Sequence, residues 1–149
     1  ALDVERLSSL VNSLGLTGLG GKRSSGYGKF SMAEDLLELD EAGIYKDDAA
    51  LYAMLKSEDS RYYMNLSTVV PQAGEIETVK KGSYKLINRS GFIASTSWGE
   101  ARKRDAVCAL EAGSCFDKRL QGQVLALEAK DCPHPVYRYG KGMFAGLPL

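Results

Sequence analysis

Histidine and cysteine are scarce in this sequence of 149 residues, and its net charge is zero; each property excludes a class of protein. The single histidine, His134, leaves little material for a histidine-based catalytic centre. The three cysteines are odd in number and irregularly spaced, which argues against a disulfide framework. Such a cysteine content is typical of a protein in a reducing compartment. The 19 basic and 19 acidic side chains cancel, so bulk charge alone cannot attract nucleic acid.

Long apolar runs are absent as well. No run reaches the roughly 18 apolar residues that cross a bilayer, so we expect no contact with a membrane. The opening ALDVERLSSL mixes acid and base and lacks the apolar centre of a secretion signal, which favours the cytoplasm. The hydrophobic fraction of 44% is nevertheless enough to build a core, in one ordinary domain or two small ones.

The charges are distributed unevenly along the chain. Residues 6–33, 78–98 and 132–149 contain basic side chains and no acid, whereas residues 34–59 hold nine acids against two lysines. This pattern predicts a polar molecule with a positive side, although solvated faces also cluster by chance.

The first 40 residues predict a helix, a glycine-rich loop and a strand. Apolar residues repeat at helical spacing within residues 3–14, at Leu7, Leu10, Val11 and Leu14. Six glycines fall within residues 15–28, and a strand or an extended segment is expected to start at residues 29–32. One helix and one strand cannot bury their apolar sides alone. We therefore expect them to complete a domain that begins before Ala1, in a longer protein.

The remaining sequence predicts an α+β domain over residues 61–149, with helices on one face of an antiparallel sheet, after an acidic linker and helix at 41–60. The linker helix is expected at 47–59, capped by Asp47 or Asp48 and with an apolar stripe at Ala50, Leu51, Met54 and Leu55. A second helix is expected at 72–81, with Ile76 and Val79 inward and Gly82 as its stop. Strands are expected at 61–70, 83–94 with a bulge at Gly91, 106–110, 124–128 and 136–139. In the first strand, alternation predicts one shared face for Tyr62, Met64, Leu66, Thr68 and Val70.

The glycine-rich loop fits neither of the two common phosphate loops. The nucleotide-triphosphate loop requires a glycine five residues before Gly21-Lys22, where this chain has Leu16, and Arg23 replaces the required Ser or Thr. Both that loop and the dinucleotide loop run from a strand into a helix, whereas this one runs from a helix into a strand.

The composition of the loop instead suits single-stranded RNA. Glycine lets backbone amides approach phosphates, arginine and lysine add charge, hydroxyls donate hydrogen bonds, and an aromatic ring can stack on a base. These residue types are all present as Gly20, Gly21, Lys22, Arg23, Ser24, Ser25 and Tyr27. The alternative is an ordinary surface loop with turn glycines.

Other reactive side chains favour structural roles. His134 lies between two prolines with no evident nucleophile partner, and the three cysteines lack the close pairs of a zinc site. We therefore expect no metal, no cofactor and no catalytic centre. Trp98, in the polar loop 95–104, either anchors a partner or folds back on the sheet.

Segments of the chain resemble the RAMP superfamily of CRISPR-associated RNA-binding proteins. GLTGLGGKRSSGYGKF (15–30) is similar to the glycine-rich loop of that superfamily. YKLINRSGFIAS (84–95) and HPVYRYGKGMF (134–144) resemble segments of the fourth-subunit family of type III-A Csm effector complexes, and YYMNLSTVVP (62–71) corresponds to a similar strand there.

The resemblance implies two ferredoxin-like (RRM-like) domains, of which residues 1–40 would end the first. It implies a non-catalytic subunit that serves antiviral defence in a prokaryote, with the glycine-rich loop on the 5′ handle of the CRISPR RNA. Its implied protein partners are the large polymerase-like subunit and the neighbouring backbone RAMP subunit. Second-rank RNA contacts carried over from the two segments are Arg89, Ser90, His134, Tyr137, Arg138 and Tyr139. The N-terminal half of the family is not in this sequence.

Two other functions remain open from the sequence. One is a CRISPR RNA-processing endoribonuclease of the same superfamily, dependent on His134. The other is a protein–protein scaffold whose contact surface is the acidic stretch 34–59.

Overall fold

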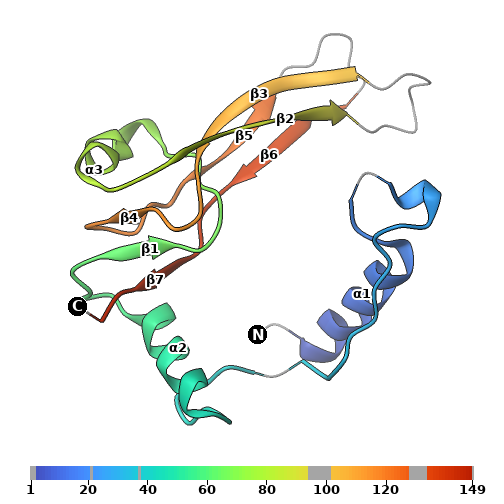
Figure 1. The fold of residues 1–149 in the computed structure, drawn as a ribbon, viewed down its shortest axis with the longest axis horizontal. Helices are drawn as coiled ribbons and strands as arrows, with labels where there is room; N and C mark the ends of the chain where they lie inside the picture. The colour runs from blue at the N-terminus through green and yellow to red at the C-terminus, as the bar shows by residue number, and fades with distance from the viewer. Residues whose placement is uncertain (1–2, 21, 37, 94–101, 128–133, 149) are drawn as a thin grey trace. The chain divides into compact units, whose positions relative to one another are not determined.

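The structure is a computed structural model that describes residues 3–20, 22–36, 38–93, 102–127 and 134–148. The chain divides into two units, Ala1–Asp40 and Glu41–Leu149, shown in Figure 1.

Helix α1 (Val4–Thr17) is the long helix of the first unit and confirms the predicted helix, but it continues three residues into the expected glycine-rich loop, so Gly15 lies inside it. Asp3 caps it by accepting a hydrogen bond from the backbone N–H of Arg6 at 3.2 Å. Its leucines are exposed, Leu10 by 59%. A short 3₁₀ turn, η1 (Arg23–Ser25), follows in the loop.

Of the two alternatives predicted for residues 29–32, a strand or an extended segment, the strand is wrong. These residues carry no strand pairing. The N–H of Phe30 instead donates to the carbonyl of Gly15 at 3.2 Å, so this segment returns along α1. The physical reason is that a strand requires a neighbouring strand, and the described residues of this unit provide none.

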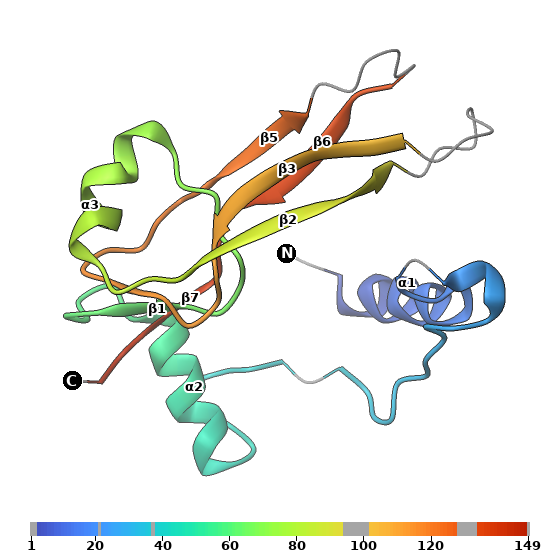
Figure 2. The same cartoon turned by 45° about the horizontal axis from the view of Figure 1, so that its top comes forward.

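The second unit contains an antiparallel sheet and two antiparallel ribbons, seen from two directions in Figures 1 and 2. In the sheet, β1 (Tyr63–Asn65) lies between β4 (Cys115–Phe116) and β7 (Phe144–Gly146). One ribbon pairs β2 (Leu86–Ile93) with β3 (Arg102–Leu110), and the other pairs β5 (Gln123–Leu127) with β6 (Val136–Gly140). The α+β class with antiparallel pairing is therefore confirmed.

The helices of this unit lie at its sheet end. Helix α2 (Lys46–Lys56) packs against β7, and α3 (Ile76–Lys81), preceded by the turn η2 (Ala73–Glu75), packs against β4. The prediction that Asp47 or Asp48 caps α2 is wrong, because the helix begins earlier and its cap residue is Tyr45; Asp48 instead contributes from inside the first turn. Its carboxylate accepts the N–H of Tyr45, the residue that caps the helix, at 3.0 Å.

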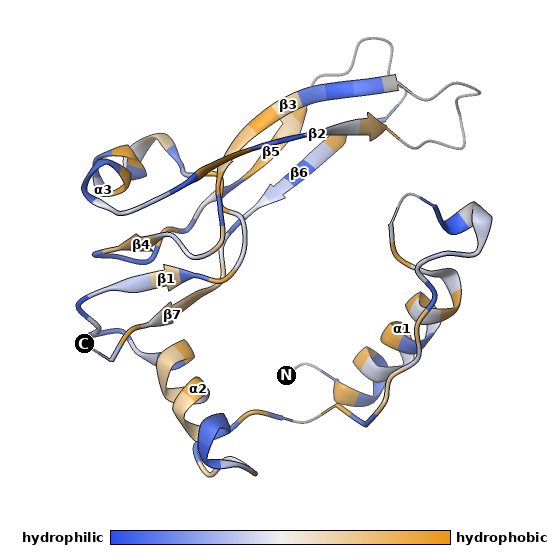
Figure 3. Ribbon diagram, in the orientation of Figure 1, coloured by the Kyte–Doolittle hydropathy of each residue, from blue (hydrophilic) through white to orange (hydrophobic). Residues whose placement is uncertain are grey.

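Two apolar clusters form the core. The first joins the sheet to α3 and includes the fully buried Phe116 and Val69. The second joins the two ribbons through Val107 and Ala109 of β3, with Leu125 and Leu127 of β5 packed against them. Strand β3 accordingly changes from hydrophilic at its Arg102 end to hydrophobic towards Leu110 (Figure 3).

The expected strand at 61–70 is shorter than predicted. Of the residues predicted to share one face, Met64 is only half-buried in β1, whereas Val70, beyond β1, is buried. Only Tyr63–Asn65 form β1, and Tyr63 and Asn65 are buried while Tyr62 is exposed. Further along, Val69 makes a single bridge to Leu110. Alternation alone could not choose the face, because both faces carry apolar side chains in this sequence.

The predicted helix at 72–81 is divided into η2 and α3. Val79 is buried as expected, but Ile76 is 39% exposed. Gly82 ends α3 with φ −84° rather than a left-handed turn, so glycine is present for space: a Cβ there would collide with the ring of Phe116.

The ribbons largely match their predicted strands. The register of β2 and β3 shifts between Arg89 and Gly91, as predicted. The polar loop 95–104 ends earlier than expected, because β3 already begins at Arg102. Trp98 lies outside the described residues. Strands β4 and β7 were not predicted from the sequence, and a ferredoxin-like arrangement remains a prediction.

Candidate nucleic-acid interface

The glycine-rich loop is closed at its base by backbone contacts. The N–H of Leu19 donates to the carbonyl of Gly28 at 2.8 Å, and the N–H of Gly18 donates to the carbonyl of Leu14 at 2.7 Å. Gly28 has φ +77°, and a Cβ there would overlap the carbonyl of Leu19. The two arms therefore meet so closely that only glycine fits at this position.

The tip of the loop is a compact turn built around the carbonyl of Lys22. That carbonyl accepts the N–H groups of Ser25 at 3.1 Å and Tyr27 at 3.3 Å. The side chains of Lys22, Arg23 and Ser25 are exposed, and Tyr27 is 67% exposed. The loop thus presents two cations, a hydroxyl and a ring to the outside of its unit.

The remaining loop candidates lie as follows. Gly20 has φ +92° with open space where a Cβ would stand. Ser24 belongs to η1, and Gly21 lies outside the described residues. Within the part of the chain that the structure describes, neither Lys22 nor Arg23 forms an ion pair, so both charges remain available to an anion.

The second-rank candidates all belong to the other unit. Arg89 and Ser90 are exposed on β2, next to the register shift. His134 precedes β6, with its Nδ1 atom 3.3 Å from the carbonyl of Pro135. Tyr137, Arg138 and Tyr139 follow one another on β6, so alternation separates Arg138 from the two tyrosines.

Arg104 is a cation beside these candidates that the sequence reasoning missed. One of its terminal nitrogens donates to the carbonyl of Ser90 at 3.4 Å, and its guanidinium lies 3.2–3.5 Å from where a Cβ of Gly91 would stand. Its Nε is buried without a hydrogen-bond partner. The signal available in the sequence was the basic run at 102–104.

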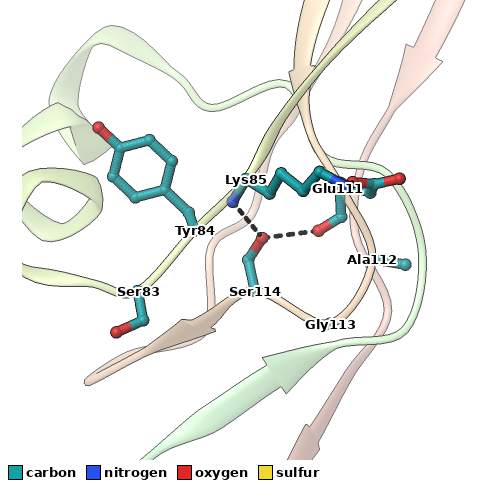
Figure 4. Close-up of a pocket in the computed structure, with 7 residues that line it drawn as sticks. All are labelled: Ser83, Tyr84, Lys85, Glu111, Ala112, Gly113 and Ser114. Carbon is teal, nitrogen blue, oxygen red and sulfur yellow. Dashed lines mark hydrogen bonds and ion pairs between the residues drawn. The ribbon is translucent and has the colours of Figure 1, made fainter.

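A hollow lies at the end of the β2–β3 ribbon that is nearer the sheet, between residues 83–85 and 111–114 (Figure 4). Lys85 and Glu111 form an ion pair of 3.1 Å beside it. The hydroxyl of Ser114 donates to the carbonyl of Glu111 at 2.7 Å and accepts the N–H of Lys85 at 3.3 Å. These contacts join the two strands; none of the predicted site residues lies among them.

Within the described ranges, no group of three or more His, Cys, Asp or Glu side chains is arranged to hold a metal ion. None of the helices in those ranges is long and apolar enough to cross a membrane. Cys108 and Cys115 are free thiols, and Cys132 lies outside the described residues.

Comparison with known proteins agrees with the resemblance seen in the sequence. Residues 58–147 match the family model of the CRISPR Csm4 C-terminal domain. A "CRISPR system Cms protein Csm4" of Streptococcus thermophilus is 34% identical over 150 residues, covering 100% of this chain and 47% of the relative. One of Mycobacterium tuberculosis (strain CDC 1551 / Oshkosh) is 34% identical over 137 residues, covering 90% of this chain and 40% of the relative.

The chain thus spans less than half the length of these curated relatives. Its family match covers β1 to β7, the sheet and both ribbons of the second unit. The chain belongs to the CRISPR Csm4 C-terminal domain family.

Proposed function

We propose that the protein is a non-catalytic, RNA-binding subunit of a type III-A CRISPR effector ribonucleoprotein. It holds the 5′ handle of the CRISPR RNA and contacts the large polymerase-like subunit and the neighbouring backbone RAMP subunit. It acts in antiviral defence in a prokaryotic cytoplasm. Its relatives carry the name of a CRISPR Csm4 protein, which supports the assignment to a CRISPR complex.

The observation that carries the RNA-binding role is the geometry of the glycine-rich loop. Its base is fixed by the Leu19–Gly28 hydrogen bond, while its tip exposes Lys22, Arg23 and Tyr27. A fixed base reduces the conformational entropy that binding would cost. The cations of the tip attract phosphates, and the ring offers a stacking surface that tolerates any base.

The first unit supports the further proposal that the protein has a ferredoxin-like fold. The first unit would be the end of a ferredoxin-like domain, with α1 as its last helix and the loop after it. The exposed leucines of α1 fit a helix that packs against the rest of such a domain.

The test is binding of handle RNA by the full chain over a range of salt concentrations. The double variant Lys22→Ala/Arg23→Ala leaves two phosphates of the RNA without a cation. The slope of log K against log salt should therefore fall by about 0.7 for each of these phosphates, or roughly 1.4 in total. Lys81→Ala, which removes an exposed charge on α3, is the control for loss of a cation elsewhere and should leave the slope unchanged.

An unchanged slope in the double variant would contradict the proposal. The non-catalytic part is tested separately with a CRISPR repeat transcript. We expect the protein to leave it intact; cleavage that disappears with His134→Ala would instead establish an endoribonuclease.

A further inference from the structure

The outer face of the β5–β6 ribbon carries two tyrosines that no part of the proposed mechanism uses as a pair. Tyr137 and Tyr139 alternate on β6 and so share one face. Their cross-strand neighbours on β5 are the small residues Ala126 and Val124. Each ring therefore has only a smaller side chain directly across from it on the neighbouring strand.

Both rings are largely exposed. Tyr137 is 62% and Tyr139 is 68% exposed, and Val124, the β5 partner of Tyr139, is 44% exposed. Helix α2 packs against β7 and α3 against β4, and in both Figures 1 and 2 neither helix lies over this ribbon. The opposite face of the ribbon is the one that packs in the core, through Leu125 and Leu127.

The charge around this face suits an anionic ligand. Strand β5 carries no charged residue, and residues 133–149 contain no acid. Lys141 lies just beyond β6, whereas alternation places Arg138 on the opposite face of the strand. An aromatic face on which neither strand places an acid, with a lysine beyond its end, fits a polyanion that also carries flat rings, which is the chemistry of single-stranded nucleic acid.

The spacing of the rings fits the same ligand. A strand rises about 3.4 Å per residue, so residues two apart lie about 7 Å apart along it. Adjacent bases of a single strand can therefore each meet one ring. Aliphatic residues at these positions would offer a docking surface to a protein, but they would not provide the stacking faces that bases use.

We propose that Tyr137 and Tyr139 form a base-stacking platform for unpaired nucleotides of the bound RNA, without preference for base identity. The inference rests on the proposed function and deepens it by giving two of the second-rank candidates, on the second unit, a shared role in base stacking. The glycine-rich loop contributes charge, and this platform contributes stacking.

The test compares paired substitutions in the full chain. Tyr137→Leu/Tyr139→Leu keeps apolar bulk but removes the rings, whereas Tyr137→Phe/Tyr139→Phe keeps the rings. Stacking of one base contributes enough that each missing ring should weaken binding of handle RNA about fivefold or more. The Phe variant should bind within about twofold of the wild type, and Tyr84→Leu, at another exposed tyrosine of this unit, serves as the control.

An abasic oligonucleotide of the same length separates stacking from charge. It retains its phosphates, so we expect the wild type and the Leu variant to bind it equally. For handle RNA, the Leu variant should lose affinity with an unchanged salt slope, because no cation is removed. Thermal unfolding of each variant verifies the fold, which substitutions at such exposed positions should preserve.

Three results would overturn the inference. Unchanged affinity of the Leu variant would do so, as would an equal loss in the Phe variant, which would point to the hydroxyls. Unchanged RNA binding together with loss of a protein subunit from the complex would make this face a protein contact. In all three cases the loop variant Lys22→Ala/Arg23→Ala can still show its reduced slope, so the proposed function is judged separately.

Discussion

Arg119 donates a hydrogen bond to the backbone carbonyl of Leu55 at 2.7 Å, although 64 residues separate the two in the chain. The same guanidinium donates to the carbonyls of Ser57 at 2.7 Å and of Phe144 at 3.1 Å. It also lies 5.1 Å from the ring centre of Tyr63. One side chain thus joins the C-terminal end of α2 to β1 and β7, where the partial negative charge of the helix end favours a cation.

Replacing Arg119 should destabilise the second unit. Arg119→Ala leaves several half-buried carbonyls without donors, so we expect a loss of about 2–4 kcal/mol in the free energy of unfolding. Arg119→Lys keeps the charge but not the planar fork and should recover only part of the loss. Urea denaturation measures both. The neighbouring exposed Lys118→Ala is the control, and an Arg119→Ala variant as stable as this control would contradict the prediction.

Glu75 fixes the turn before β5 through its carboxylate. It accepts the backbone N–H groups of Gln121 at 2.5 Å, Gly122 at 3.2 Å and Gln72 at 2.8 Å. Glu75→Gln replaces one carboxylate oxygen by an NH₂ group, which then faces at least one of these backbone N–H groups instead of accepting from it. We therefore expect a loss of about 1–3 kcal/mol in the free energy of unfolding.

The matched control for that substitution is Glu77→Gln. Glu77 is exposed and pairs only with Lys80 among the described residues, one turn away on α3. Its substitution should change the free energy of unfolding by less than about 0.5 kcal/mol. Equal effects of the two substitutions in thermal or urea unfolding would show that the backbone contacts of Glu75 contribute little.

Gly82 provides the space in which α3 packs on β4. A Cβ at this position would collide with the ring of Phe116 and stand 2.7 Å from the carbonyl of Cys115. Gly82→Ala should therefore cost about 1–3 kcal/mol, because a fully buried ring must move. Gly74→Ala, in open space on η2, should be neutral or slightly stabilising. A tolerated Gly82→Ala would mean that this part of the core yields easily.

Gly28 fixes the base of the glycine-rich loop. Gly28→Ala and Gly26→Ala carry a similar backbone cost, because φ is +77° and +81°, but only position 28 meets another group. Gly28→Ala should therefore speed hydrogen exchange of the Leu19 amide and weaken handle binding, while Gly26→Ala should affect both much less. Equal exchange rates in the two variants would contradict a closed base.

The sequence alone determined the features that arise from neighbouring residues. Helix α1 follows from its leucine repeat and from Asp3, which caps it, and the α+β class follows from the apolar patterns of the strands and helices. The strands of the two ribbons were largely predictable because β2, β5, β6 and the second half of β3 carry apolar residues typical of strands, whereas the charged start of β3 was not recognised. The loop residues from Gly20 to Tyr27 were identified as candidates because their chemistry is concentrated in one short segment.

Tertiary structure decided the features that depend on distant pairing. Strands β4 and β7 contain two and three residues, too few to show a pattern, and are strands because Tyr63 pairs with Phe116 and Gly146. The buried face of β1, the position of Arg104 over Gly91 and the exposure of Tyr137 and Tyr139 were likewise settled by packing. The sequence of a strand determines which residues share a face. Which face is buried depends on the remote segments that pack against the strand, and this is decided only in the folded chain.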